Sequence, residues 1–105
     1  MFEEVWYISE MSNWGQQYMN MEVRAYIQLD ELNDGCFQFR LCRGDFLSKK
    51  RVSEDGRRIE LRFIGTDELD PCSGQVWISL INENKIQGEF IFDQGEESTF
   101  LAVKG

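Results

Sequence analysis

Residues 75–92, QVWISLINENKIQGEFIF, contain the clearest strand pattern of the chain. Apolar side chains recur at every second position on both sides of the polar break Asn82-Glu83-Asn84. Successive side chains of a β-strand point to opposite faces, so a period of two predicts strands with one buried face. A short break rich in asparagine between two such runs is typical of a hairpin turn. The stretch therefore predicts an antiparallel β-hairpin.

The same alternation recurs along the rest of the chain, and turn-forming residues separate the runs. We interpret as strands the run containing Trp6 and Ile8, VRAYIQL (23–29), CFQFRLCR (36–43), the weaker polar and basic run 46–52, RRIELRF (57–63), and the run containing Phe100 and Ala102. The turn signals between them are Asn33-Asp34-Gly35, Arg43-Gly44-Asp45, Glu54-Asp55-Gly56 and Gln94-Gly95. With the hairpin, these runs predict eight strands in one all-β domain, residues 1–105. An antiparallel up-and-down meander closing into a small barrel is expected, and two packed sheets are the alternative.

One segment departs from the period of two. Trp14, Tyr18 and Met21 are spaced i, i+4, i+7, which places them on one face of a helix, and Ser12 is available as its N-cap. This spacing predicts a short helical insert near residues 12–21 whose aromatic side chains cover one end of the barrel. Because the inward positions of the strands are dense in Phe, Ile and Leu, we expect a filled interior rather than a ligand-holding cup.

Composition excludes several classes of protein. Apolar residues make up 42% of the chain and aromatic residues 13%, which is too apolar for a disordered protein. No apolar run approaches the roughly 20 residues of a membrane helix, and the first residues lack the basic region of a signal peptide. We therefore expect a cytoplasmic protein that does not bind membranes.

The net charge of −8 argues against nucleic acid as a partner. Eight of the eleven basic residues lie between Arg40 and Arg62, and we interpret them as a solvated strand face.

The cysteines do not predict a disulfide or a metal site. Cys36 and Cys42 fall in one expected strand, so their Cα atoms would lie about 20 Å apart, beyond the limit of about 7 Å for a disulfide. Cys72 is expected to be an inert thiol in an acidic loop. The chain has no histidine and no C-x-x-C pair, so neither zinc nor a histidine-dependent nucleophile is expected. We predict no cofactor.

Alternate loops of a meander share one end of the barrel, and in this chain that end is acidic. The stretch GTDELDPCSG (65–74) is the expected connector there. Its carboxylates lack the spacing of a calcium loop, so we interpret it as a polar turn without metal or catalytic residues. The end is nevertheless the expected place for a ligand. Its candidate ligand-binding residues are Trp14, Tyr18, Arg43, Asp67, Glu68, Asp70, Asp93, Glu96 and Glu97.

A second candidate surface lies on the outer face of the last strands. Apolar side chains there point away from the interior, and monomers rarely expose a large apolar patch. Either the insert near residues 12–21 or another subunit is expected to cover it, and a two-fold homodimer is the common form of the latter. The candidate interface residues are Trp77, Ile81, Ile91, Leu101 and Val103.

Two segments also resemble a family of uncharacterised small bacterial all-β proteins. These segments are IGTDELDPCSG and GEFIFDQGEESTFLAVK. The corresponding family patterns are G-x-D-E-x-D-x-x-S-G and F-H-x-G-D-D-S-x-F. This chain has Asp93 where the pattern has histidine. The resemblance implies no activity, but it implies that the two acidic loops belong together.

These observations predict a small non-enzymatic binding or assembly module that contacts another protein through its outer apolar face. The alternative is a small-molecule-binding, lipocalin-like barrel with its mouth at the acidic end. An enzyme that uses Asp67, Glu68 or Asp70 is a third possibility, since fold alone does not define chemistry.

Overall fold

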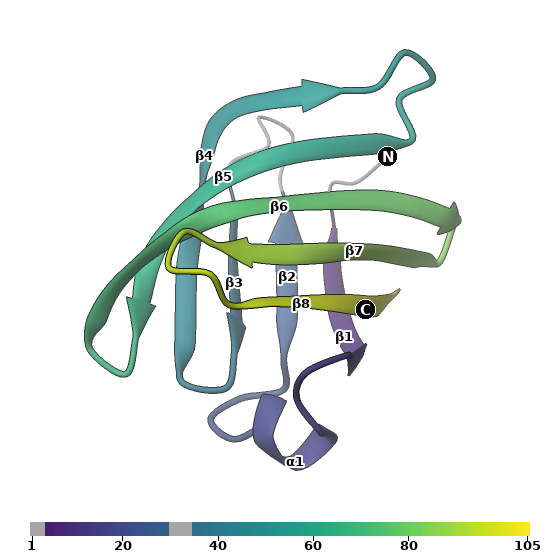
Figure 1. The fold of residues 1–105 in the computed structure, drawn as a ribbon. Coiled ribbons are helices and arrows are strands. Elements are labelled where there is room, and N and C mark those ends of the chain that lie inside the picture. Colours follow the sequence, from purple (N-terminus) through teal and green to yellow (C-terminus); the bar gives the residue numbers. More distant parts are fainter. Residues whose placement is uncertain (1–3, 30–34) are drawn as a thin grey trace.

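The protein is an antiparallel eight-stranded barrel. The computed structural model describes the backbone of residues 4–29 and 35–105, and the side chains of the same residues except 48–51. Each strand pairs with its neighbours in the sequence, and β8 pairs with β1 to close the barrel (Figure 1). The elements are β1 (Val5–Met11), α1 (Gln16–Met19), β2 (Tyr26–Leu29), β3 (Gly35–Phe39), β4 (Cys42–Val52), β5 (Arg58–Asp67), β6 (Asp70–Asn82), β7 (Lys85–Phe92) and β8 (Glu97–Lys104). This confirms the predicted closed meander with one short helical insert.

No helix in the described ranges is long and apolar enough to cross a membrane.

The predicted turns at Glu54-Asp55-Gly56 and Gln94-Gly95 lie between strands as expected. The predicted turn at Asn33-Asp34-Gly35 lies largely outside the described residues.

The predicted strand 36–43 is wrong, because a hairpin turn interrupts it. Phe39 pairs with Cys42, so Arg40 and Leu41 form a two-residue turn between β3 and β4. Apolar and polar residues keep alternating through the turn, and the buried positions move on by one residue from Phe39 to Cys42. In the sequence the two strands therefore look like one. The expected turn at Arg43-Gly44-Asp45 lies within β4 instead. Gly44 pairs with Phe37, and a Cβ there would lie 2.9 Å from the Phe37 ring, so close packing explains the glycine.

The stretch GTDELDPCSG is also a hairpin rather than a ten-residue connector. β5 continues to Asp67 and β6 begins at Asp70, which leaves only Glu68 and Leu69 in the turn. Both have positive φ, 52° and 80°. A two-residue hairpin of this kind needs left-handed backbone at both central positions, which glycine and asparagine adopt most easily. The sequence offers neither residue there, and the turn was therefore missed.

Aromatic rings fill the interior of the barrel. Phe37 lies at its centre, with the Phe39, Phe46, Phe63 and Phe90 ring centroids 4.8–5.6 Å away. These spacings are typical of favourable aromatic pairs. The expected filled core is thus present, and most of the inward positions named by the alternation are buried. Val23 is an exception, because it precedes β2 and is exposed.

The insert between β1 and β2 covers one end of this core. Trp14 stacks on Phe39 with 5.4 Å between ring centroids, and Met19 is fully buried. The expected N-cap was wrong, since α1 follows Gly15 without a side-chain cap. The Ser12 hydroxyl instead accepts a hydrogen bond of 3.0 Å from the Thr99 amide. Ser12 therefore ties the insert to β8 rather than capping the helix.

Candidate functional site

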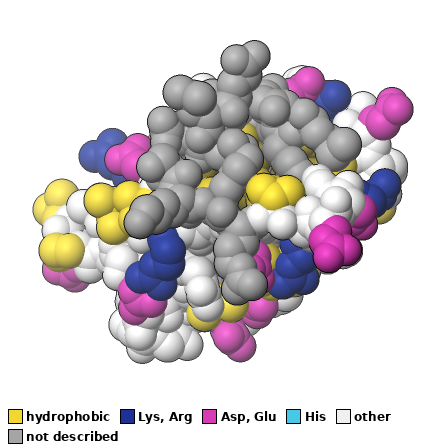
Figure 2. Space-filling view, turned by 90° about the horizontal axis from the view of Figure 1, so that it is seen from above, with side chains coloured by type: hydrophobic (Ala, Val, Ile, Leu, Met, Phe, Trp, Pro, Cys, Tyr) yellow, Lys and Arg dark blue, Asp and Glu magenta, His cyan; other side chains and the backbone are white. Residues whose placement is uncertain are grey.

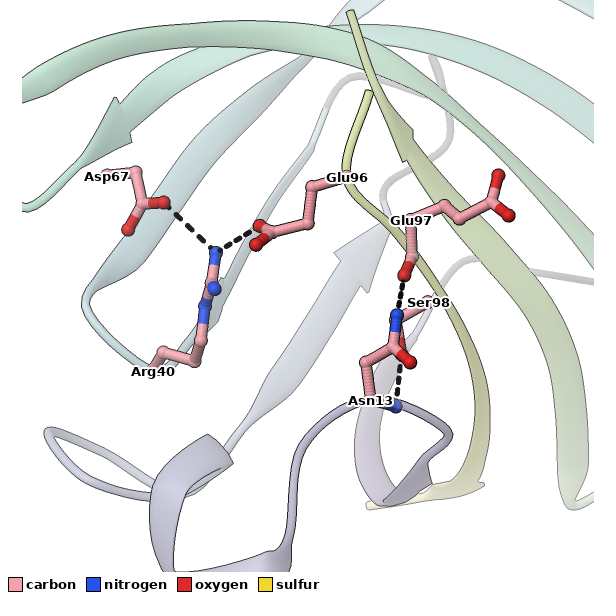
Figure 3. A network of polar contacts seen from close by, with 6 residues as sticks. All are labelled: Asn13, Arg40, Asp67, Glu96, Glu97 and Ser98. Carbon is pink, nitrogen blue, oxygen red and sulfur yellow. Dashed lines mark hydrogen bonds and ion pairs between the residues drawn. The ribbon is translucent and has the colours of Figure 1, made fainter. Parts of the chain in front are cut away.

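The acidic end of the barrel is organised around a residue that the sequence did not single out. Arg40, in the β3–β4 turn, donates from Nη2 to Asp67 Oδ2 at 3.1 Å and to Glu96 Oε1 at 3.2 Å. Figure 3 shows its side chain between these two carboxylates, which come from β5 and from the β7–β8 loop. Two of the predicted site residues are thereby brought together. The turn after β3 thus links the loops after β5 and β7.

Arg40 is also part of the packed cap. Its side chain is 6% exposed, and its guanidinium lies 4.1 Å from the centroid of the Trp14 ring. Its backbone amide donates to the carbonyl of Met19 at 2.8 Å. The Nε atom is buried and has no hydrogen-bond partner within the described residues. Because its charge is largely removed from water, the two carboxylates are needed to compensate it.

A neutral network attaches the insert to β8 beside this ion cluster. The Asn13 side-chain amide donates to the carbonyl of Glu97, and the Asn13 backbone amide donates to Ser98 Oγ at 3.2 Å (Figure 3). Ser98 is buried, and its hydroxyl accepts from the Asn13 amide and donates to the carbonyl of Thr99 at 3.0 Å. Glu97 therefore contributes its backbone to the network, and its carboxylate lies on the surface.

Asp93, another predicted site residue, belongs to a separate surface cluster. Arg62 donates to its two carboxylate oxygens at 3.1 and 2.7 Å, and Ser73 Oγ donates to it at 2.7 Å. The hydrogen bonds from Arg62 and then from Ser73 lower the pKa of the Asp93 carboxyl below its ordinary value. This carboxylate is already paired, so it is not free to act as an acid or base.

We expect Asp93 to titrate below an ordinary aspartate. A lowered folded-state pKa stabilises the fold above the unfolded-state pKa of about 3.9, and this contribution is lost as the pH falls through the lower folded-state value. Carboxyl-carbon NMR titration should give Asp93 a midpoint below the ordinary value of about 3.9, and Arg62→Gln should raise it. A midpoint at or above about 3.9 would contradict the assignment.

A groove opens beside the β5–β6 turn. It has a volume of about 440 Å³ and we call it the Leu69 groove. Its lining residues are Glu22, Gln38, Leu41, Arg43, Thr66, Glu68 and Leu69. Gln38, Arg43 and Thr66 form one cross-strand row on β3, β4 and β5. Arg43 and Glu68 are the predicted site residues found here, whereas exposed Tyr18 and Asp70 do not line the groove.

Leu69 stands out in this groove on two grounds. Its side chain is 91% exposed, the highest value among the large apolar residues for which exposure is described. Its φ of 80° is also unfavourable for a residue with a branched side chain. Figure 2, seen from above, shows hydrophobic side chains at the left edge, the side on which Figure 1 places the β5–β6 turn. No signal in the sequence identifies it, because the β5–β6 turn contains neither glycine nor asparagine.

The predicted interface residues do not form one continuous patch. Trp77 pairs with Glu60 on one side and Glu89 on the other, and its Nε1 donates to Glu89 at 3.3 Å. The Arg58 guanidinium lies 4.4 Å from the centroid of the Trp77 ring. Polar residues therefore occupy both cross-strand positions beside Trp77.

Only two of the five interface candidates meet in one groove. Trp77 and Leu101 line a hollow of about 350 Å³ together with Glu10, Ser12, Gln87, Gly88, Thr99 and Phe100. We call it the Trp77 groove. Val103 lines a different depression beside Lys85 and Lys104, and Ile81 and Ile91 line neither of these hollows.

The cysteines differ from expectation. Cys42 and Cys72 are both buried, in β4 and β6, and each thiol affects the pKa of the other, so Cys72 is not a lone loop thiol. Burial, followed by the neighbouring Cys72 and Asp67, raises the pKa of Cys42 to about 12. Burial also raises the pKa of Cys72. The hairpins after β3 and β5 turn these residues inward.

We expect one thiol of the native protein to react with Ellman's reagent near pH 8. Cys36 is partly exposed, whereas Cys42 and Cys72 are protonated and shielded. Denaturant should release the other two. The Cys36→Ser variant should not react while folded, and rapid reaction of two native thiols would contradict the buried placement.

The described part of the chain holds no group of three or more Cys, Asp or Glu residues arranged for a metal ion. Asp67, Glu96 and Asp93 are committed to arginines. These three carboxylates are therefore held in ion pairs.

No protein-family model matches the chain, and comparisons with curated proteins and with solved structures give no significant match. The resemblance to small bacterial all-β proteins stays a prediction.

Proposed function

We propose that this protein is a small non-enzymatic binding module that holds a segment of a partner protein in the Leu69 groove. The supporting observation is Leu69 itself, which is 91% exposed and in left-handed backbone. A leucine there is unfavourable for the turn and for contact with water. Positions that break local rules of this kind are characteristic of functional surfaces. A partner that covers Leu69 would recover the cost of its exposure.

Leu69→Asn should abolish partner binding without lowering the free energy of unfolding. Asparagine tolerates positive φ, so we expect the free energy of unfolding to stay the same or to rise by up to about 1 kcal/mol. Urea unfolding measures this change. The same variant should lose its partner, because the apolar side chain beside the groove is gone.

Affinity capture followed by measurement with the purified partner tests the binding. Ile64→Thr is the matched control, since Ile64, on β5, is 52% exposed but lies outside the groove. A protein that binds the wild type and Ile64→Thr, and binds Leu69→Asn at least tenfold more weakly, would support the proposal. Equal binding to all three would exclude the Leu69 groove.

The Trp77 groove is a second candidate surface. It lies on the outer face through which the sequence predicts contact with another subunit. It is supported by the joint lining of one hollow by Trp77 and Leu101. If a second copy binds there, Trp77→Gln should weaken self-association in sedimentation velocity experiments. Val103→Thr, outside that groove, should have no effect, and a wild type that stays monomeric at high concentration would exclude a homodimer.

A lipocalin-like carrier with its mouth at the acidic end is less well supported. Phe37 and its neighbouring rings fill the described interior, and Trp14, Met19 and Arg40 cover that end. A ligand would have to displace these side chains.

A further inference from the structure

The charges around the Leu69 groove indicate what kind of partner fits it. Glu22 and Glu68 line the groove, both are exposed, and neither makes an ion pair within the described part of the chain. Arg43 is the basic lining residue and is likewise unpaired among the residues described. Arg40 offsets one of the two negative charges of Asp67 and Glu96. Glu22 and Glu68 together exceed the charge of Arg43 by one, so the groove lining is net negative.

Further acidic groups surround this groove. Asp70 is exposed on the other strand of the hairpin, directly across from Asp67. The chain as a whole carries a net charge of −8. Fields from such groups add over the surface and attract ligands of opposite charge. A cationic segment therefore gains attraction at long range and contacts at the groove.

The apolar and polar lining residues have separate places. Leu41 and Leu69 come from the turns after β3 and β5, whereas Gln38, Arg43 and Thr66 form a polar row across the strands. An apolar side chain of a partner fits against the two leucines. Its backbone carbonyls then have Arg43, Gln38 and Thr66 as hydrogen-bond donors.

We propose that the partner segment is basic, with an apolar side chain that contacts Leu41 and Leu69 flanked by lysine or arginine residues that pair with Glu22 and Glu68. This inference rests on the proposed function, because it assigns chemistry to the partner of the same groove. Complementary charge contributes mainly to specificity and to the rate of association. Binding is accordingly expected to weaken as salt screens exposed charges.

Two synthetic peptides of 12 residues test the sign of the charge. One combines leucine with lysine, and the other has glutamate at every lysine position. In amide NMR titrations at low salt, the lysine peptide should shift the signals of Leu41, Arg43 and Thr66 to Leu69. Glu22→Gln/Glu68→Gln should weaken its binding about fivefold, because exposed ion pairs are individually small.

The matched control is Glu54→Gln/Glu83→Gln. These exposed carboxylates lie in the turns after β4 and β6, at the opposite end of the barrel, and their removal changes the net charge by the same amount. Unchanged binding to this control would separate groove contacts from general attraction. Equal weakening in both double variants would overturn the assignment of Glu22 and Glu68.

The outcomes also separate this inference from the proposed function. If both peptides bind the groove equally and Leu69→Asn abolishes both interactions, the basic partner is wrong and the Leu69 groove stands. If neither peptide shifts the groove signals at millimolar concentration, the basic partner is overturned. The capture experiment with Leu69→Asn then decides the groove independently.

Discussion

Replacing Asp67 and Glu96 together with asparagine and glutamine should cost about 3 kcal/mol of unfolding free energy, since it leaves the guanidinium of Arg40 buried without an opposing charge. The Arg40 side chain is 6% exposed, whereas those of Asp67 and Glu96 are 28% and 43% exposed. Water therefore hydrates the carboxylates more easily than the arginine. The loss of unfolding free energy should therefore be larger when the carboxylates are removed than when Arg40 is removed.

Arg40→Met should cost less than half as much as the double carboxylate variant. Methionine keeps apolar contact with the Trp14 ring, and the two carboxylates that remain can be hydrated. The triple variant, with all three charges removed, should return to within about 1 kcal/mol of the wild type. Urea unfolding of the wild type, the double variant, Arg40→Met and the triple variant measures these free energies. Equal losses for Arg40→Met and the double variant would contradict the asymmetric burial.

Phe37→Ala should destabilise the barrel by about 3–5 kcal/mol, the range for removing a buried phenylalanine. Four rings contact Phe37, so the cavity forms where several strands meet and cannot easily collapse. This loss is a large fraction of the 5–15 kcal/mol that stabilises a typical domain.

The thermal and urea midpoints should both fall steeply in Phe37→Ala. Ile64→Thr is again the control, because Ile64 is half exposed on the outer face, and surface substitutions usually change stability by about 0.5 kcal/mol or less. If Phe37→Ala loses less than about 1 kcal/mol, the interior is not packed as a single aromatic cluster.

Particular elements explain how far the sequence could be interpreted. The runs around Val76, Ile86 and Phe100 were assigned correctly because one buried face imposes a period of two over many residues. The β3–β4 and β5–β6 hairpins were missed because Arg40 and Leu69 occupy left-handed positions where glycine or asparagine is expected. No turn residue marked the point at which the alternation changed strands.

The sequence located the end of the barrel that holds the candidate site, but it did not identify all of the residues in that site. The rule that alternate loops share one end correctly brought Asp67 and Glu96 together. It could not identify Arg40 as their common partner, because that residue was assigned to a strand. Nor could the pattern show that Glu60 and Glu89 flank Trp77 and that the Arg58 guanidinium lies over its ring.

The eight-stranded meander barrel, its filled apolar interior and its acidic end were predictable, because they follow from periodicity and composition along the chain. The pairing of charges, the proximity of Cys42 to Cys72 and the exposure of Leu69 were not. Those properties depend on contacts between strands far apart in sequence and on backbone conformation at single turn residues. In this protein they place Arg40 inside the cap and Leu69 outside it.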